Sequence, residues 1–271
     1  SRILYVKRTP LTLFYKRRIS RILPAFILFV VTIYTATFLV GTPHSWTEFI
    51  STLTFLRTYI PETPNIWQAG IPIGHLWSLN IEEHCYVLMS LLTLPLLLRG
   101  KEGGVLIGLA ILATMTHILY IKAPSLGVTM PEIRTETASA TLLVSAGYYL
   151  VKNRWAAYIK PWMPLAAFVI AILSYSKLFP WWSSILIAPF MLAFAVNHLD
   201  VTYPVSRAAL AATPLRLLGI WSYSIYLWQH PFQAYKSAFI PGTAFLAAML
   251  MGICSFYLFE NLIRTWLNRH W

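Results

Sequence analysis

Residues 23–40 read LPAFILFVVTIYTATFLV, a stretch without a single charged side chain. At about 1.5 Å per residue, a helix of this length is long enough to cross a hydrocarbon layer about 30 Å thick. Similar runs recur along the chain, in which 58% of residues are hydrophobic, only 11% are charged and the mean hydropathy is +0.62. A soluble domain usually carries about 25% charged residues. The sequence therefore predicts an all-α fold, a polytopic membrane helix bundle.

We expect about eight transmembrane helices in one membrane domain over residues 1–271, with no soluble domain. They are expected at residues 23–40, 76–98, 105–121, 138–151, 163–175, 181–196, 217–235 and 244–262. Residues 46–57 are moderately apolar and are expected to form an interfacial or re-entrant segment. The two cysteines, Cys85 and Cys254, fall inside apolar runs, where they predict neither a disulfide framework nor a metal site.

The net charge of +12 follows the expected topology. With the N-terminus inside, the loops place most of the 21 Lys and Arg residues on the inner side. The outer ones are Arg57, Lys122, Arg134, Lys177 and Lys236. Because basic residues favour the cytoplasmic side, we expect both termini in the cytoplasm and the protein in the cell (inner) membrane, in contact with its lipids. The basic residues do not form a patch interleaved with aromatic residues, so the sequence does not predict a nucleic-acid partner.

Residues 75–86 read HLWSLNIEEHCY and place ionisable groups inside an expected span. Such groups are costly in a membrane and are usually functional. On a helix, one polar face would carry His75, Ser78, Glu82 and Tyr86. Desolvated carboxylates are suited to proton transfer, so Glu82 and Glu83 are candidate catalytic groups. The alternative is a structural pair tied to an Arg or Tyr on another helix.

Residues 219–231 read GIWSYSIYLWQHP. Helical spacing places Tyr223, Tyr226 and His230 on one face, and Pro231 would disturb the helix near its end. Such side chains could form a platform for a sugar or another polyol. Taken alone, they are more typical of an aromatic belt that packs at the membrane interface.

Two shorter segments carry charge. Arg134 and Glu136 stand two residues apart, and alone they are typical of an ion pair at a helix end. The basic residues Lys16, Arg17, Arg18 and Arg21 precede the first expected span. They indicate either a topology signal attracted to anionic lipids or a docking site for a phosphorylated donor.

These segments, in this order, resemble the acyltransferase-3 family of membrane O-acyltransferases. The Trp77-Ser78-Leu79 triplet followed by Glu82 and Glu83 is similar to the family's most specific motif. Further resemblance is found in the basic segment around Lys16, in Arg134…Glu136, in residues 222–228 (SYSIYLW) and in Tyr257…Glu260. Two positions depart from the pattern: Gln229 stands where the family often has His, and no Pro follows Glu260 closely.

The resemblance implies transfer of an acyl group, usually acetyl from cytoplasmic acetyl-CoA, to a hydroxyl of a glycan or similar acceptor at the outer face. It implies no permanently bound cofactor. The catalytic residues would be Glu82, Glu83 and His75. Those facing the acceptor would be Trp77, Ser78, Tyr86, Arg134, Glu136, Tyr223, Tyr226, Trp228, Gln229 and His230. Acyl-CoA would meet Lys16, Arg17, Arg18 and Arg21. Lipopolysaccharide, exopolysaccharide, peptidoglycan and small glycosides all remain open as acceptors.

The resemblance also implies two further helices before Ser1, the first carrying an essential Arg and His, which would give ten spans. We therefore expect this chain to be inactive by itself. Two other classes stay open. A secondary transporter could couple to a proton or ion through Glu82 and Glu83, although no repeated halves are visible. A non-catalytic structural subunit of a membrane complex is the other.

Overall fold

The structure is a computed structural model that describes residues 2–43, 45–61, 66, 70–176, 178–240 and 242–270. The expected outer cation Lys177 lies outside the described residues. Within them the chain is helical and contains no strand. It forms two compact units, unit 1 from Ser1–Pro10 and Ile81–Ala211 and unit 2 from Leu11–Asn80 and Ala212–Trp271. The division falls inside helix α3, Trp77–Leu91.

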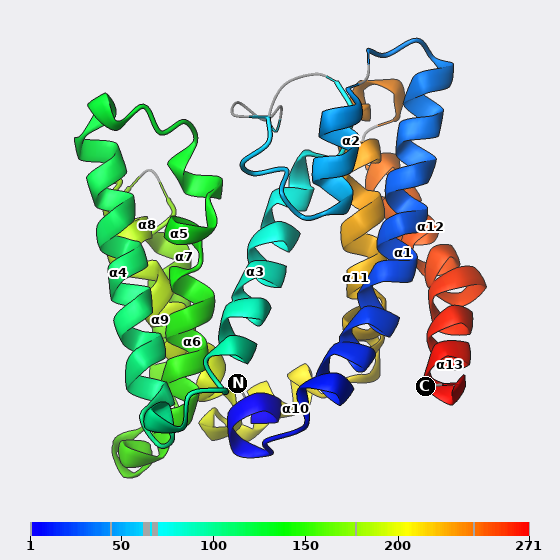
Figure 1. The fold of residues 1–271 in the computed structure, drawn as a ribbon. Helices are drawn as coiled ribbons and strands as arrows, with labels where there is room; N and C mark the ends of the chain where they lie inside the picture. Colours follow the sequence, from blue (N-terminus) through cyan, green and yellow to red (C-terminus); the bar gives the residue numbers. More distant parts are fainter. Residues whose placement is uncertain are drawn as a thin grey trace. The chain divides into compact units, whose positions relative to one another are not determined.

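Unit 1 contains the second part of α3 and a bundle of helices (Figure 1). Its helices are α4 (Glu102–Lys122), α5 (Thr135–Ala138), α6 (Ala140–Val151), α7 (Met163–Leu173), α8 (Ser183–Leu186), α9 (Ala188–Asn197) and α10 (Pro204–Leu210). A π-helical turn covers Arg2–Val6, and 3-10 turns cover Leu96–Leu98, Pro124–Leu126, Pro131–Ile133, Lys152–Arg154, Ala156–Tyr158 and Leu199–Val201.

Two glycines let α4 and α6 come close together. A Cβ atom placed on Gly147 of α6 would lie 2.8 Å from the carbonyl oxygen of Gly103 in α4. A Cβ atom on Gly103 would lie 2.8 Å from a methyl carbon of Val151. Small residues at such crossings allow close backbone packing between membrane helices. The α4–α6 crossing therefore depends on the absence of a side chain at these two positions.

Polar contacts hold the N-terminal π-helical turn to the rest of unit 1. The Tyr5 hydroxyl donates to the Met89 carbonyl over 2.6 Å. Burial raises the pKa of Tyr5 to about 12, and the nearby Glu102 carboxylate adds to the rise in this pKa. The hydroxyl therefore stays protonated at neutral pH and remains a donor. Arg8 pairs with Glu102 at 3.2 Å.

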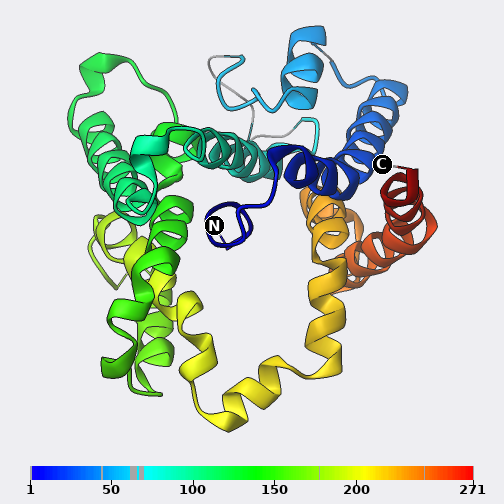
Figure 2. The same cartoon turned by 60° about the horizontal axis from the view of Figure 1, so that its bottom comes forward.

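Unit 2 is built on the longest helix, α1 (Leu11–Leu39). Its other helices are α2 (Trp46–Leu53), the 3-10 turn η2 (Gly74–Leu76) that leads into α3, α11 (Thr213–Ala234), α12 (Thr243–Ser255) and α13 (Asn261–His270). A π-helical turn, Phe256–Glu260, joins α12 to α13. The red C-terminal segment lies beside the blue α1 in both ribbon views (Figure 1, Figure 2), and contacts join α1 to α13.

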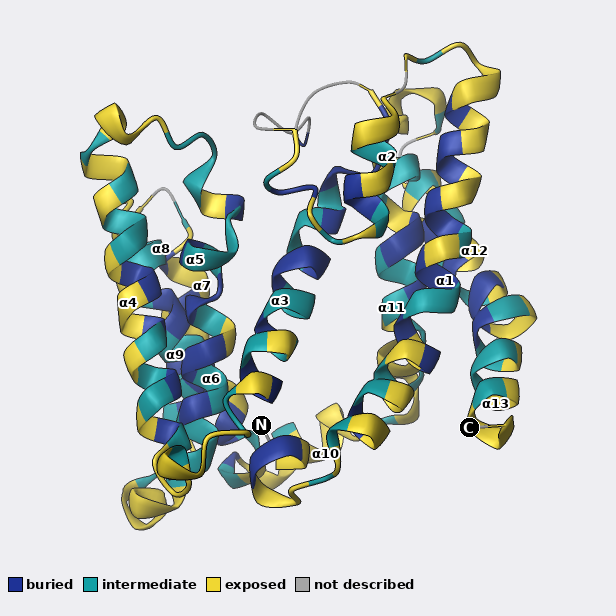
Figure 3. Ribbon diagram, viewed as in Figure 1, coloured by how far each residue is buried: buried dark blue, intermediate teal, exposed yellow. Residues whose placement is uncertain are grey.

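The core of unit 2 gathers along one face of α1. Phe26, Phe29 and Val30 are fully buried and pack with Leu76 of η2 and Leu227 of α11. Large apolar side chains on the opposite face of α1 are exposed, among them Ile27, Val31 and Phe38. Figure 3 shows this division between buried and exposed positions along the helix. An exposed apolar face of this length is what a lipid-facing helix requires.

Three described helical segments are long and apolar enough to cross a membrane: Leu11–Leu39, Glu102–Lys122 and Thr243–His270. The expected spans at 163–175 and 181–196 correspond to the shorter apolar helices Met163–Leu173 and Ser183–Asn197. The expected count of eight is not confirmed. For the span expected at 76–98, α3 already ends at Leu91, and α6 has only 12 residues. Helix α11 is long, but its many polar side chains lower its hydropathy.

Candidate active site

His75 lies at the centre of a buried aromatic cluster in unit 2. Its imidazole stacks on the ring of His230 of α11, with ring centroids 4.9 Å apart and planes at 16°. Phe29 of α1 meets it edge-on at 5.6 Å, and Tyr226 of α11 meets it at 4.9 Å. Trp228 meets Phe29 edge-on, with ring centroids 5.3 Å apart. Segments far apart in the chain therefore bring together two of the expected site imidazoles.

The tyrosine hydroxyl of Tyr226 holds this cluster to the start of α3. It donates to the His75 carbonyl over 2.6 Å and lies 2.9 Å from the Ser78 hydroxyl. Tyr223, one turn earlier, donates to the Ile22 carbonyl of α1 over 3.0 Å. The two tyrosines expected to face the acceptor thus position the backbone. Tyr226 reaches η2 and α3, whereas Tyr223 joins α11 to α1.

Several nitrogen atoms of the cluster are buried and have no hydrogen-bond partner among the described residues. They are both ring nitrogens of His75, Nδ1 of His230 and the indole nitrogen of Trp228. Buried polar atoms are usually paired, and exceptions often mark a site that a ligand or water completes. Pro231 has no N–H, so it cannot donate the backbone hydrogen bond that an α-helix would place between residue 231 and the Leu227 carbonyl. The arrangement can offer an imidazole nitrogen to an incoming hydroxyl group.

A buried ion pair supports the same region and was missed by the sequence analysis. The Arg57 side chain is 1% exposed, and its Nη1 donates to the Glu48 carboxylate of α2 over 2.5 Å. The Asn80 amide, oriented to satisfy its neighbours, accepts from the Arg57 backbone N–H and donates to the Leu76 carbonyl, both at 3.1 Å. The expectation that Arg57 lies on the outer side stays a prediction, and the structure adds that its side chain is buried. The only sequence signal was a Glu nine residues before an Arg.

The glutamate pair belongs to unit 1. Glu82 and Glu83 are both partly buried on α3. His84, between them and Cys85, is 2.6 Å from the Thr135 hydroxyl at the start of α5, with Nδ1 as the contacting atom. The expected Arg134 and Glu136 also lie here, and Arg134 Nε donates to the Thr129 carbonyl over 3.2 Å. The structure thus joins α3 to the segment that carries Arg134, close to where the sequence places the carboxylates.

The remaining expected residues divide by exposure. Trp77 is half-buried at the first position of α3, and Gln229 is exposed on α11. Tyr86 lines a separate cavity of about 190 Å³ in unit 1, together with Ser145 and Asn197. The structure brings together His75, Ser78, Tyr226, Trp228 and His230 within unit 2. None of the ring contacts and hydrogen bonds described above for this cluster involves Trp77, Gln229 or Tyr86.

The expected acyl-CoA residues lie on α1 itself. Lys16, Arg17 and Arg21 are exposed and Arg18 is half-buried, all within the first three turns of the helix. The helix therefore begins earlier than the expected span, because Lys and Arg are good helix formers. Ser20 donates to the Asn268 side chain of α13 over 3.2 Å. This contact joins the basic part of α1 to the C-terminal helix.

A buried carboxylate joins two of the sequence motifs. Glu260 is 2% exposed, and its Oε2 accepts a hydrogen bond from the Ser224 hydroxyl over 2.5 Å. Ser224 belongs to residues 222–228, and Glu260 ends the π-helical turn after α12. At the same crossing, Gly252 of α12 approaches the backbone of Ile225, where a Cβ atom would lie 2.6 Å from its Cα. The α11–α12 pair is thus joined by a close approach and a buried hydrogen bond.

No group of three or more His, Cys, Asp and Glu residues is arranged to hold a metal ion within the part of the chain that the structure describes.

Comparison with known proteins identifies relatives. The acyltransferase-3 family, whose profile describes an acyltransferase domain, matches residues 3–261. Proteins of Staphylococcus aureus strains COL and MW2, each named "Putative O-acetyltransferase", are 31% identical to this chain over 111 residues. That match covers 37% of this chain and only 18% of each relative's length. No solved structure matches the chain.

Proposed function

The chain belongs to the acyltransferase-3 family, and from this membership we propose that it transfers an acetyl group from cytoplasmic acetyl-CoA to a hydroxyl of a cell-surface glycan. The observation that carries the proposal is the family match over residues 3–261. The named relatives support O-acetyl transfer in particular. The exposed apolar face of α1 supports a place in the cell (inner) membrane, and the uneven distribution of Lys and Arg supports cytoplasmic termini.

In the proposed reaction, the oxygen of the acceptor hydroxyl attacks the thioester carbonyl and the carbon–sulfur bond breaks. The hydroxyl proton passes to a base and then to the departing thiolate, giving the ester and free CoA. His75 suits the role of base, because neither of its ring nitrogens is hydrogen-bonded within the described residues. A positioned base of this kind contributes about 10²- to 10⁴-fold to a rate.

Glu82 and Glu83 are proposed to orient the base that takes the proton of the acceptor hydroxyl, or to accept that proton themselves. Lys16, Arg17, Arg18 and Arg21 are proposed to meet the phosphates of acyl-CoA, since they lie on the first turns of α1 and are largely exposed. The donor is a substrate in this scheme, and no permanently bound cofactor is required.

The test is an acetyl-transfer assay on the protein as encoded, reconstituted into proteoliposomes with acetyl-CoA inside and a glycan outside. We expect Glu82→Gln and Glu83→Gln to lower transfer at least about 100-fold while expression is unchanged. Glu132→Gln is the matched control, because Glu132 is exposed and outside the proposed machinery. Full activity in both glutamine variants would refute the roles given to the pair, and proton-coupled uptake without acetyl transfer would refute the proposed function.

A further inference from the structure

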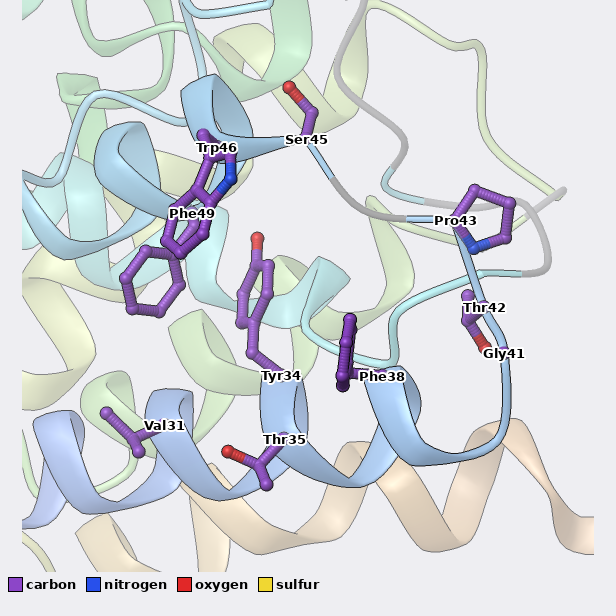
Figure 4. A pocket seen from close by; sticks show the side chains of 10 residues that line it. All are labelled: Val31, Tyr34, Thr35, Phe38, Gly41, Thr42, Pro43, Ser45, Trp46 and Phe49. Carbon is purple, nitrogen blue, oxygen red and sulfur yellow. The ribbon is translucent and has the colours of Figure 1, made fainter.

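A cavity of about 660 Å³ lies between α1 and α2 in unit 2. Sites for small molecules commonly have volumes of about 300–1,000 Å³. Figure 4 shows the rings of Tyr34 and Phe38 on α1 and those of Trp46 and Phe49 on α2 around the space. Tyr34 and Phe49 meet edge-on at 4.9 Å, and Trp46 meets Phe49 at 6.0 Å. Four aromatic side chains from two helices therefore enclose this cavity.

The chemistry of the lining limits what it can hold. Among the residues that the structure describes, the lining contains no charged side chain, and it adds the hydroxyl groups of Thr35, Thr42 and Ser45 to that of Tyr34. These described residues offer an anionic headgroup no basic partner, and a plain alkyl chain would place methylene groups against the hydroxyls. A sugar ring has apolar C–H faces that pack on aromatic rings and a rim of hydroxyls that can pair with the lining hydroxyls. The lining therefore fits a neutral sugar ring best.

The cavity lies next to the His75 cluster along α1. Phe29 touches His75, and Tyr34 follows it by five residues, which is about 7.5 Å along the helix axis. Both residues belong to the same buried core. The end of α1 at Leu39 is about 15 Å from Phe29 by the same measure. Exposure falls in the same direction, from 70% at Phe38 to 7% at Tyr34. The inner end of the cavity, at Tyr34, is thus close along α1 to the residue that contacts His75.

We propose that this cavity binds a sugar ring of the acceptor, packed against Trp46 and Phe38 with the Tyr34 hydroxyl at its inner end. This inference rests on the proposed acyltransferase function, of which it names the acceptor site. It assigns to the α1–α2 pair the binding of the acceptor and to the His75 cluster the reaction of its hydroxyl.

The experiment is saturation-transfer NMR on the protein as encoded in lipid nanodiscs, with methyl β-glucopyranoside and methyl N-acetyl-β-glucosaminide as probes and without any acyl donor. We expect transfer from aromatic protein protons to the ring C–H protons of at least one probe. Trp46→Ala should weaken binding about tenfold, equivalent to about 1.4 kcal/mol, and Trp46→Phe should restore it. Trp46 is 80% exposed, so its truncation leaves the core intact. Trp182→Ala, an exposed tryptophan of unit 1, is the matched control.

Absence of transfer to both probes would overturn the inference. So would transfer that survives both Trp46→Ala and Phe38→Ala, or contact of these rings with lipid chains alone that the sugars do not displace. The outcome is separable from that of the acetyl-transfer assay. Sugar binding without acetyl transfer would refute the proposed function and leave the cavity assigned. Acetyl transfer whose KM for the acceptor is unchanged by Trp46→Ala would refute the cavity assignment alone.

Discussion

The Tyr226 hydroxyl provides the sharpest test of the site geometry. Tyr226→Phe removes one hydroxyl and with it the hydrogen bonds to the His75 carbonyl (2.6 Å) and to Ser78 (2.9 Å). Each typical hydrogen bond contributes about 1 kcal/mol net, so the expected loss of stability is about 1–2 kcal/mol. The Ser78 hydroxyl still lies 3.4 Å from the same carbonyl and limits the loss. The free-energy change alone is therefore modest.

A matched variant separates stability from positioning. Tyr223→Phe, on the same helix, also removes a hydroxyl that donates to a backbone carbonyl, that of Ile22 at 3.0 Å. Both variants should lower the melting temperature by a similar few degrees in detergent. Only Tyr226→Phe should lower kcat of acetyl transfer, by about tenfold, because of the two tyrosine hydroxyls only that of Tyr226 contacts the backbone of His75. Small displacements of a catalytic group commonly cost at least this much.

The assay measures melting by tryptophan fluorescence and acetyl transfer by release of free CoA thiol. Equal kcat values for Tyr226→Phe and Tyr223→Phe would refute the positioning role of Tyr226. The double variant Ser78→Ala/Tyr226→Phe adds a second criterion. Since the two hydroxyls contact each other, their effects on stability should not be additive. Strict additivity would show that the contact contributes nothing.

Two further predictions concern packing. Gly147→Leu should destabilise the protein by about 1–3 kcal/mol or more, because the leucine side chain would collide with the backbone of α4. Gly104→Leu on α4 is the control and should melt close to the wild type, since a Cβ atom there meets open space. Equal melting temperatures for the two variants would contradict the close approach of α4 and α6. Arg57→Met should lower the free energy of unfolding by about 3–5 kcal/mol, because it leaves the Glu48 carboxylate without this partner. Adding Glu48→Gln should recover part of that loss, as measured by thermal unfolding. No recovery in the double variant would show that the two side chains are not coupled.

Much of the helical architecture could be predicted from local sequence. All but the last residue of the uncharged run at residues 23–40 lies inside α1, and the run at 105–121 lies inside α4, because hydropathy and length act locally. The ends were less predictable. Helix α1 begins at Leu11, since Lys16 and its basic neighbours join the helix instead of preceding it. The residues of the His75 cluster, apart from Phe29, were also named from sequence, by helical spacing and by resemblance to the family.

What each named residue contacts depended on the tertiary structure. His75 and Tyr226 are 151 positions apart, and no periodicity within either segment indicates that one hydroxyl binds the other's carbonyl. The burial of Arg57 was likewise unpredictable, because its partner on α2 and its place beside Asn80 arise only once the segments pack. Sequence patterns specify which face of a helix avoids water or tolerates lipid. The pairing of those faces is decided by where backbones can approach, as at Gly147, and by which buried polar groups can satisfy one another across helices.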